Sequence, residues 1–403
     1  MLRNAICTFQ IFQKITDYQI RMTRDTSHFD YIIIGSGLAG FQLALKMASD
    51  SFFSDKKIAL IDPSKKTKND KTWSFWEKQP SFWDDLVFKS WQKASIITSK
   101  DSITLNLVPY CYKTIKSIDF YSYAKQILNN KKNFIVHHET VTNTSELEYV
   151  KVTTDKNTYT AHHVFDSRIP DTFNINTSKH SSIIQHFKGW VIRCNTNVFD
   201  NHCMTMMDFR LKDGNQTTFT YVLPFSKNEA LIEFTYFTKE TVEASVYDEY
   251  IAQYITNYLN IDSYTIVETE IGQIPMTDYP FEKLNTLRIT KIGTAGGWVK
   301  GSTGYAFKHT EKKAHRIIEN IKANRLPTYK LSKKRFKFYD KIFLKVLQDE
   351  NEKGEWIFYQ FYKKNNVQTM FKFLDEESTF FEDLQIMWSL FSFSFIKAFF
   401  KTL

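Results

Sequence analysis

Three glycines and one aspartate near the start of the chain have the spacing of a dinucleotide-binding site. Gly35, Gly37 and Gly40 form a Gly-x-Gly-x-x-Gly motif, and Asp62 follows at close to the ~20 residues expected before a ribose-binding acid. In such motifs the first glycine makes a tight turn, the second admits a pyrophosphate and the third packs a helix on a strand. The amides that begin the helix then face the phosphates. The predicted cofactor contacts here are Gly35, Ser36, Gly37, Leu38, Ala39, Gly40 and Asp62.

A second glycine cluster lies late in the chain, after the strand-like run 287–290. Flavoproteins built from two segments close their dinucleotide site with such a late loop, whose amides meet the remaining phosphate and the flavin ring. Together with the first motif, this cluster indicates FAD rather than NAD as the resident dinucleotide. The predicted contacts here are Gly293, Gly296, Gly297 and Gly304.

Acidic and basic side chains on two predicted strands are further candidates. In the run 230–238, alternation places Leu231, Glu233 and Thr235 on one face of a strand. Glu233 is therefore either a solvated outward residue or a carboxylic acid in a substrate pocket. Asp166 and Arg168 end another strand, where they form either a surface ion pair or a support for the cofactor.

The elements that must position these residues follow from the hydrophobic pattern. Residues 31–34 and 57–61 are short apolar runs typical of buried parallel strands, and residues 38–48 between them have helical spacing. We therefore predict an α/β protein with a Rossmann-type FAD-binding domain, an antiparallel-sheet substrate domain and C-terminal helices. The expected division is FAD binding in 29–95, 140–180 and 285–325, substrate binding in 96–139 and 181–284, and a helical, possible membrane-facing segment in 326–403, after an N-terminal extension of poor order in 1–28.

Composition limits the function further. The 403 residues carry a net charge of +9 and include 36 Phe and 21 Tyr. A basic surface suits nucleic acid or an anionic membrane, and because no nucleic-acid motif is present, we expect the membrane and no nucleic acid. The four cysteines show neither metal spacing nor a disulfide framework, so we expect a reducing cytoplasm and no metal. No apolar run reaches the ~18 residues of a spanning helix, which favours peripheral membrane association.

Several of these stretches together resemble the flavin-dependent lycopene cyclases of carotenoid biosynthesis, most closely the bacterial β-cyclases. Two departures stand out. Phe234 occupies a position where the family often has an acid, so no second carboxylate adjoins Glu233 there, and Gly293-Thr294 lacks the acid that many flavoproteins place after this glycine. The stretches that carry the resemblance are 31–40, 69–76, 165–168, 207–210, 231–235 and 292–307.

The resemblance implies a reaction without net redox chemistry. A proton adds to the terminal alkene of lycopene, the cation closes a six-membered ring, and proton loss gives a β-ionone ring, through γ-carotene to β-carotene. It also implies reduced FAD as cofactor, NAD(P)H as the electron source, a membrane-borne substrate and Glu233 as the proton donor. Two alternatives stay open: an FAD-dependent hydroxylase or desaturase acting on a lipid or polyene, and a non-catalytic peripheral lipid-binding protein.

Overall fold

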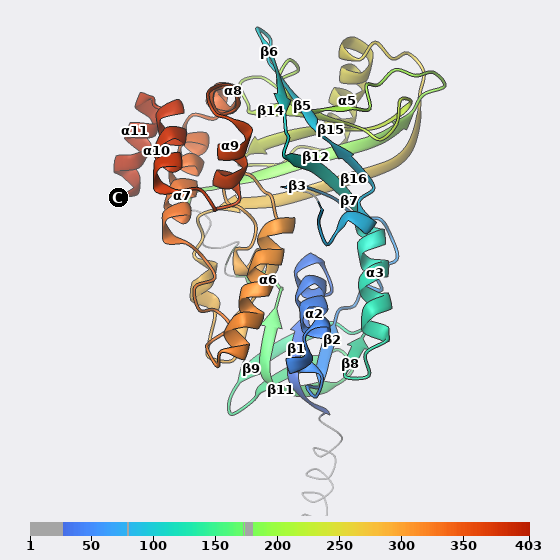
Figure 1. The fold of residues 1–403 in the computed structure, drawn as a ribbon, viewed down its shortest axis with the longest axis vertical. Helices are drawn as coiled ribbons and strands as arrows, with labels where there is room; N and C mark the ends of the chain where they lie inside the picture. Colours follow the sequence, from blue (N-terminus) through green and yellow to red (C-terminus); the bar gives the residue numbers. More distant parts are fainter. Residues whose placement is uncertain (1–26, 79, 172, 174–179) are drawn as a thin grey trace, which may run out of the picture.

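A computed structural model describes residues 27–78, 80–171, 173 and 180–403 of the chain (Figure 1). The predicted N-terminal extension lies outside the described residues, except that Ser27 and His28 already belong to the first strand. The fold contains two large sheets, one small sheet and a group of C-terminal helices.

The first large sheet has a parallel core that begins with the strand before the glycine motif. Its strands are β1 (Ser27–Ile34), β2 (Ile58–Ile61), β8 (Phe134–His137), β9 (Val141–Glu146), β10 (Val150–Thr154), β11 (Thr158–Asp166) and β17 (Ile289–Lys291). They run in the order β8-β2-β1-β11-β10-β9, and β17 pairs with the end of β11. Only β9 and β10 are antiparallel to their neighbours. The carboxyl ends of β1, β2, β11 and β17 therefore meet at one edge, where ligands of such sheets bind.

Three helices cover one face of this sheet: α2 (Leu38–Ser49), α3 (Ser117–Asn129) and α6 (Phe307–Lys322). Figure 1 shows α2 between the other two. Their apolar side chains form one buried cluster with the sheet, in which Leu43, Phe120 and Ile317 are fully enclosed.

The second large sheet is mainly antiparallel and lies across the top of Figure 1. Its strands are β5 (Lys93–Ile97), β6 (Ser102–Asn106), β12 (Ser182–Arg193), β13 (Cys203–Asp208), β14 (Thr218–Pro224), β15 (Glu229–Thr238) and β16 (Thr265–Thr277), in the order β16-β12-β15-β14-β13-β5-β6. Ile232, Phe234 and Tyr236 pack on helix α5 (Ala244–Tyr258), whereas Leu231 belongs to the core on the opposite face. The predicted alternation of this strand is confirmed.

The C-terminal helices pack on the face of the second sheet opposite α5. They are α7 (Lys334–Asp349), α8 (Gly354–Lys364), α9 (Val367–Leu374), α10 (Phe380–Ser389) and α11 (Phe393–Thr402). Leu344, Leu347 and Phe358 join the core that includes Phe219 and Phe237 of the sheet. Within the described part of the chain, no helix combines the length and apolarity needed to cross a bilayer.

A small sheet, β3-β7-β4, lies between the two large ones and comprises β3 (Thr72–Lys78), β4 (Lys89–Trp91) and β7 (Tyr110–Lys116). The predicted fold class is confirmed, but one predicted segment is divided differently. Residues 96–139 were expected in the substrate domain, yet α3 packs on α2 and β8 pairs with β2 of the nucleotide-binding sheet. The reason is the connection itself, because a parallel strand beside β2 requires a crossover helix, and α3 supplies it.

Candidate active site

A single cavity of about 400 Å³ connects the two glycine segments with Glu233. Gly37 and Gly40 line it from the turn between β1 and α2, and Gly293 and Gly304 line it from the late loop. Glu233 lines it from β15 of the second sheet. The cavity therefore spans the junction of the two large sheets, and the structure brings together residues that are some 200 positions apart in the chain.

The first glycine turn packs closely against neighbouring protein atoms at Gly35 and Gly40, but Gly37 faces open space. Gly35 has φ +94°, and a Cβ on Gly40 would lie 1.9 Å from the Gly35 carbonyl oxygen, so neither position accepts a side chain. A Cβ on Gly37, in contrast, would meet no protein atom within 4 Å. Gly37 also precedes α2 without a side-chain cap, which leaves the first amides of the helix available to a phosphate.

Asp62 lies at the end of β2, beside this turn. Its carboxylate accepts a hydrogen bond of 2.7 Å from the Ser36 amide and lies 3.7 Å from the Lys66 ammonium. Lys66 lines the cavity, whereas Asp62 and Ser36 do not. Asp62 thus holds the turn in place, and its predicted contact with a ribose stays a prediction.

Asp166 and Arg168 lie beside the cavity rather than in it. The buried Asp166 carboxylate is 2.9 Å from both the Arg168 guanidinium and the Lys291 ammonium. Burial alone would raise the pKa of Asp166, but the two cations outweigh it and hold that pKa below its usual range. This ion cluster ties the end of β11 to β17, and the predicted support of the cofactor by Asp166 and Arg168 stays a prediction. Ser167, the residue between them, lines the cavity instead.

The late glycine loop contributes only part of its predicted set. Gly293 (φ +61°) and Gly304 (φ +75°) line the cavity. Gly296 is instead required for packing, because a Cβ there would lie 2.4 Å from the Lys291 carbonyl oxygen. Gly297 caps the short helix η5 (Gly293–Gly296) in a left-handed conformation and is likewise not among the residues that line the cavity.

Two orphaned polar atoms in the cavity wall show that it suits a polar ligand. The Gln185 Oε1 and Thr303 Oγ1 atoms are buried and have no hydrogen-bond partner among the described residues. Buried polar atoms are otherwise nearly always paired, so these two indicate groups that a ligand would satisfy. Together with the bare glycine turn, they fit a flavin dinucleotide.

Glu233 has a carboxyl partner at the far end of the cavity, Glu270 on β16. Strand β12 lies between the two strands, and its Gly189 pairs with Glu233 on one side and with Glu270 on the other. A Cβ on Gly189 would lie 3.4 Å from Glu233 Cβ and 3.3 Å from Glu270 Cγ. Because Gly189 has no side chain, the two glutamate side chains lie on either side of an open position, close enough for the charge of Glu270 to act on Glu233.

The surroundings of this pair favour one shared proton. Burial and the neighbouring Glu270 charge raise the pKa of Glu233 well above its usual range, and burial also raises the pKa of Glu270. The Thr235 hydroxyl donates to Glu233 over 2.9 Å, and the Thr72 hydroxyl donates to Glu270 over 2.7 Å. The pKa of Glu233, the more deeply buried of the two, is raised more than that of Glu270.

The polar residues 69–72 connect the two halves of the molecule, a role that the sequence did not predict. Asn69 donates to Glu268, and Thr72 donates to Glu270, so the stretch holds β16 against the nucleotide-binding half. Asp70 accepts from Tyr121 over 3.1 Å and anchors the same stretch on α3. Trp73 lines the cavity, whereas Trp83 and Trp91 are buried in the core.

Tyrosines form the apolar end of the cavity. Tyr112 and Tyr305 lie with their hydroxyl oxygens 3.3 Å apart, and Tyr221 lines the same wall. Burial raises the pKa of Tyr112 to about 12 and that of Tyr221 and Tyr305 further still. These rings stay neutral at physiological pH, and their electron-rich faces suit a neighbouring cation.

Comparison with known proteins agrees with this geometry. A family model described as lycopene cyclase protein matches residues 30–399, nearly the whole chain. No curated protein matches the chain significantly.

Solved structures share the fold at low sequence identity. A geranylgeranyl bacteriochlorophyll reductase-like protein from Thermoplasma acidophilum is 12% identical, with a TM-score of 0.59 over 94% of this chain and 100% of that chain. The flavin-dependent brominase Bmp2 is 12% identical, with a TM-score of 0.60 over 87% and 94%. The halogenase PltM, in complex with phloroglucinol and FAD, is 10% identical, with a TM-score of 0.55 over 93% and 90%. At these identities the likeness concerns the fold, which is that of FAD-dependent flavoproteins.

Proposed function

This chain belongs to the lycopene cyclase family, and we propose that it is a lycopene β-cyclase that converts both acyclic ends of lycopene into β-ionone rings, through γ-carotene to β-carotene. The observation that carries this proposal is the buried Glu233–Glu270 pair at the apolar end of a cavity that begins at the dinucleotide-binding turn.

Glu233 acts as the proton donor. Its hydroxyl proton passes to the terminal alkene carbon of the substrate, which leaves a tertiary cation and a Glu233 carboxylate. The cation is attacked by a second double bond of the same chain, and the six-membered ring closes. Loss of a ring proton then forms the β double bond, and this proton returns to the Glu233–Glu270 pair. Atoms and electrons balance without an oxidant or reductant.

Glu270 has a positioning role in this scheme. Its carboxylate accepts the hydrogen bond of the Glu233 acid and keeps that acid protonated near neutral pH. After proton transfer the pair carries two negative charges beside the cation, in a site where burial weakens screening. The faces of Tyr112, Tyr221 and Tyr305 add an attraction of roughly 0.5–2 kcal/mol each.

The proposed cofactor is FAD, held at the turn from Gly37 to Gly40 and at Gly293, Thr294 and Gly304. When bound in its reduced form, with NAD(P)H as the electron source, the flavin supplies negative charge that stabilises the cation without itself changing oxidation state. We further propose that the protein works in the cytoplasm on the membrane surface, because its substrate is a hydrocarbon that resides in the bilayer.

Expression in cells that accumulate lycopene tests the function. We expect β-carotene from the natural chain and unchanged lycopene from Glu233→Gln, which removes the acid but preserves shape and hydrogen bonding. The variant should retain bound flavin, measured by its absorbance after purification. A hydroxylated or desaturated pigment would instead identify a redox enzyme, and bound but unaltered lycopene a binding protein. Normal β-carotene from Glu233→Gln would exclude Glu233 as the donor.

A further inference from the structure

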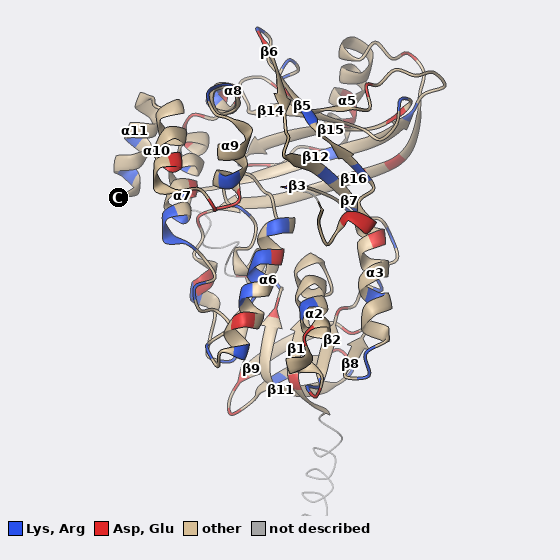
Figure 2. Ribbon diagram, in the orientation of Figure 1, with Lys and Arg blue, Asp and Glu red and all other residues tan. Residues whose placement is uncertain are grey.

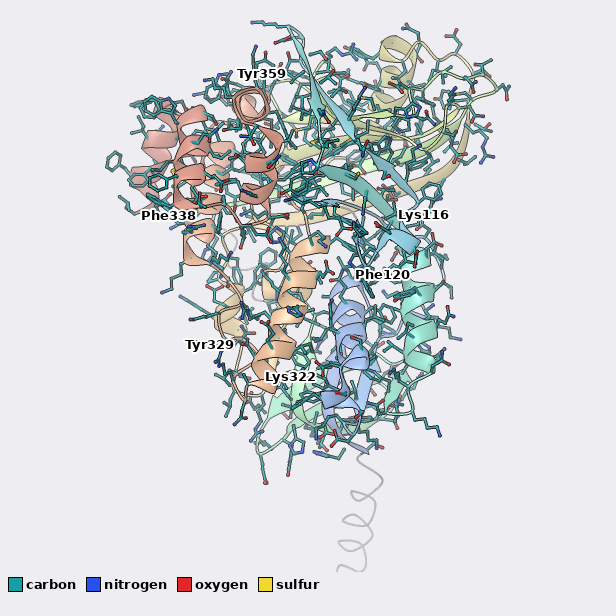
Figure 3. The ribbon with its side chains drawn as sticks, viewed as in Figure 1. Lys116, Phe120, Lys322, Tyr329, Phe338 and Tyr359 are labelled. Atoms are coloured by element: carbon teal, nitrogen blue, oxygen red, sulfur yellow. The ribbon has the colours of Figure 1, made fainter. Side chains whose placement is uncertain are left out.

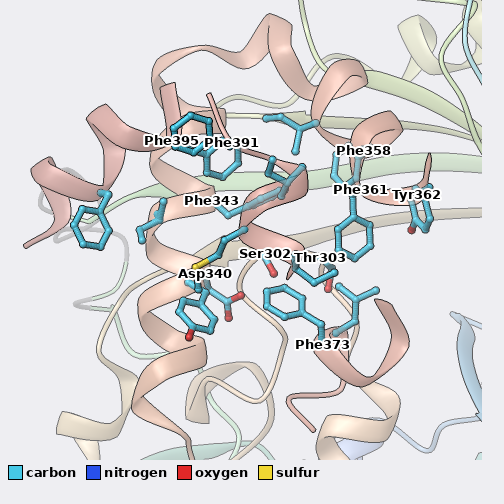
Figure 4. A pocket seen from close by; sticks show the side chains of 18 of the residues that line it. Ser302, Thr303, Asp340, Phe343, Phe358, Phe361, Tyr362, Phe373, Phe391 and Phe395 are labelled. Atoms are coloured by element: carbon cyan, nitrogen blue, oxygen red, sulfur yellow. The ribbon is translucent and has the colours of Figure 1, made fainter. Parts of the chain in front are cut away.

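A second cavity lies among the C-terminal helices and meets the late glycine loop at Ser302 and Thr303. It encloses about 280 Å³ and is lined by side chains of α7, α8, α9, α10 and α11 (Figure 4). Nearly all of these are apolar, and Phe343, Phe361, Phe373 and Phe395 surround the space. A helical bundle that served only as a cap would fill such a space, because protein cores pack without voids of this size.

The inner end of this helix cavity meets the active site. Thr303 lines both cavities, so the aromatic space and the space that contains Glu233 adjoin at this residue. Tyr362, also in the wall of the helix cavity, belongs with Tyr112, Tyr221 and Tyr305 to one group of buried, interacting tyrosines. Aromatic side chains therefore line both cavities near the residue that they share.

The outer end reaches the surface between α10 and α11. Met387, Phe391 and Phe399 line the helix cavity, yet they are 39%, 63% and 38% exposed. Trp388, Phe393 and Phe400 beside them are also exposed. A contiguous apolar patch of this kind marks an interaction surface, and here it surrounds the mouth of a cavity.

We propose that the helix cavity is the channel through which one isoprenoid hydrocarbon chain passes from a lipid surface to Glu233, and that it holds the distal part of the chain during cyclisation. This inference rests on the proposed function, which supplies a long apolar substrate. The lining indicates the occupant, because aromatic and aliphatic walls with one charged residue among them favour a hydrocarbon over a polar metabolite. Asp340, the one charged residue in the lining, is paired with Lys300 and not available to a ligand.

Fluorescence of cis-parinaric acid, a conjugated tetraene chain, tests the channel without requiring activity. In the full FAD-loaded protein, Ile396→Trp fills the outer end from the half-buried side of α11, and Ile342→Trp narrows it from α7. The matched control is Leu384→Trp, which lies exposed on α10 and is absent from the lining. We expect about tenfold weaker probe binding in the two channel variants, the loss expected from about two fewer buried methylenes, and an unchanged value in the control.

Cyclisation kinetics distinguish a failure of the channel proposal from a failure of the cyclase proposal. In the channel variants we expect the KM for lycopene to rise about tenfold, in step with the weaker binding, while kcat is retained. The channel proposal would be overturned if all three variants bound the probe as tightly as the natural protein. It would also be overturned if Leu384→Trp weakened binding as much as the two channel variants. A protein that shows no cyclisation but whose probe binding is blocked by Ile396→Trp would retain the channel and refute only the cyclase. Flavin content and thermal unfolding of each variant identify any that fails to fold.

Discussion

Glu233 is an acid whose surroundings, rather than its own chemistry, determine its protonation. An isolated glutamic acid is ionised at neutral pH and protonates no alkene. Burial opposes ionisation of Glu233, and so does the negative charge of the Glu270 carboxylate beside it. Both effects raise the pKa of Glu233 well above its usual range. The pair resembles other carboxyl dyads in which two like charges at close range share one proton.

The pH dependence of cyclisation tests this arrangement. Because the protonated Glu233 is the active form, the rate is constant below its pKa and falls as pH rises through it. Glu270→Gln removes the neighbouring charge, lowers the pKa of Glu233, and should move this descending limb to lower pH by about one unit or more. A merely structural role for Glu270 would lower the rate at all pH values without moving the limb.

The matched control for this measurement is Glu229→Gln. Glu229 lies on the same strand, β15, but forms a surface ion pair with Arg193 outside the cavity. We expect its pH profile to coincide with that of the natural protein. If Glu270→Gln retains its fold and flavin but its rate falls over the same pH range as that of the natural protein, Glu270 does not raise the pKa of Glu233.

At the scale of elements, the acid pair depends on the register of three strands. Strand β12 places Gly189 between Glu233 and Glu270, and a shift of one residue on either side would turn one carboxyl group to the α5 face. The glycine costs the strand some stability, since it contributes no side chain to the sheet. Its conformation is ordinary, so its value is the space that it leaves between the carboxyl groups.

Gly189→Ala and Gly189→Val test whether the two acids need this open position, because they add side chains of increasing size there. A Cβ at this position would lie 2.8 Å from Leu231 Cδ1 and within 3.4 Å of both glutamate side chains. We expect cyclisation to fall about tenfold in the alanine variant and about 100-fold or more in the valine variant, because a misplaced catalytic group can cost that much. Flavin content and circular dichroism should be unchanged. Full activity in Gly189→Val would show that close approach of the two acids is not needed.

The local elements of this site were predictable, but the pair was not. The turn from Gly35 to Gly40 and the alternation around Glu233 are sequence-local, and both were predicted correctly. Glu270 was missed because its contact with Glu233 depends on pairing across β12, where a bulge at Val191 and Ile192 adjusts the register. A glycine in the middle of a strand marks a close approach, and Gly189 was the signal that could have led to it.

The paired ions at Asp166 illustrate the same limit. The sequence shows an acid and a base at a strand end, but Lys291, which completes the cluster, lies on β17 and becomes a neighbour only through the parallel pairing with β11. The sequence therefore left two interpretations open, an ion pair or a support for the cofactor, and the structure shows that the charges pair with one another. The division of residues 96–139 was missed for a related reason, since the sequence does not show which sheet a short strand joins.

At the scale of the whole molecule, exposed aromatic residues and basic residues occur together on the C-terminal helices. Side chains project outward from α10 and α11 at the edge of the molecule opposite α3, and Lys and Arg colour α7 and α11 beside them (Figures 2 and 3). Exposed aromatics with neighbouring lysines are typical of proteins that lie in a membrane interface. This side also contains the mouth of the helix cavity.

Vesicle binding should therefore depend on these aromatics. Replacing Trp388, Phe393 and Phe400 together by serine is expected to weaken binding to phosphatidylglycerol vesicles at least 100-fold, since each buried ring contributes roughly 1.5–3 kcal/mol. Sedimentation with the vesicles measures it. Salt should weaken binding of the natural protein only in part, because it screens the lysines and not the apolar contact.

The control removes exposed apolar side chains from elsewhere: Val108, Leu147 and Leu287, each to serine. If membrane docking serves delivery of the substrate, the aromatic triple variant should lose cyclisation of lycopene supplied in vesicles but keep it for lycopene in detergent, whereas the control triple keeps both. Loss of cyclisation in both vesicles and detergent would instead show that these aromatic residues are needed for folding or catalysis. Equal vesicle binding by both triple variants would refute a docking side on α10 and α11, because no other difference between them is expected to matter to a bilayer.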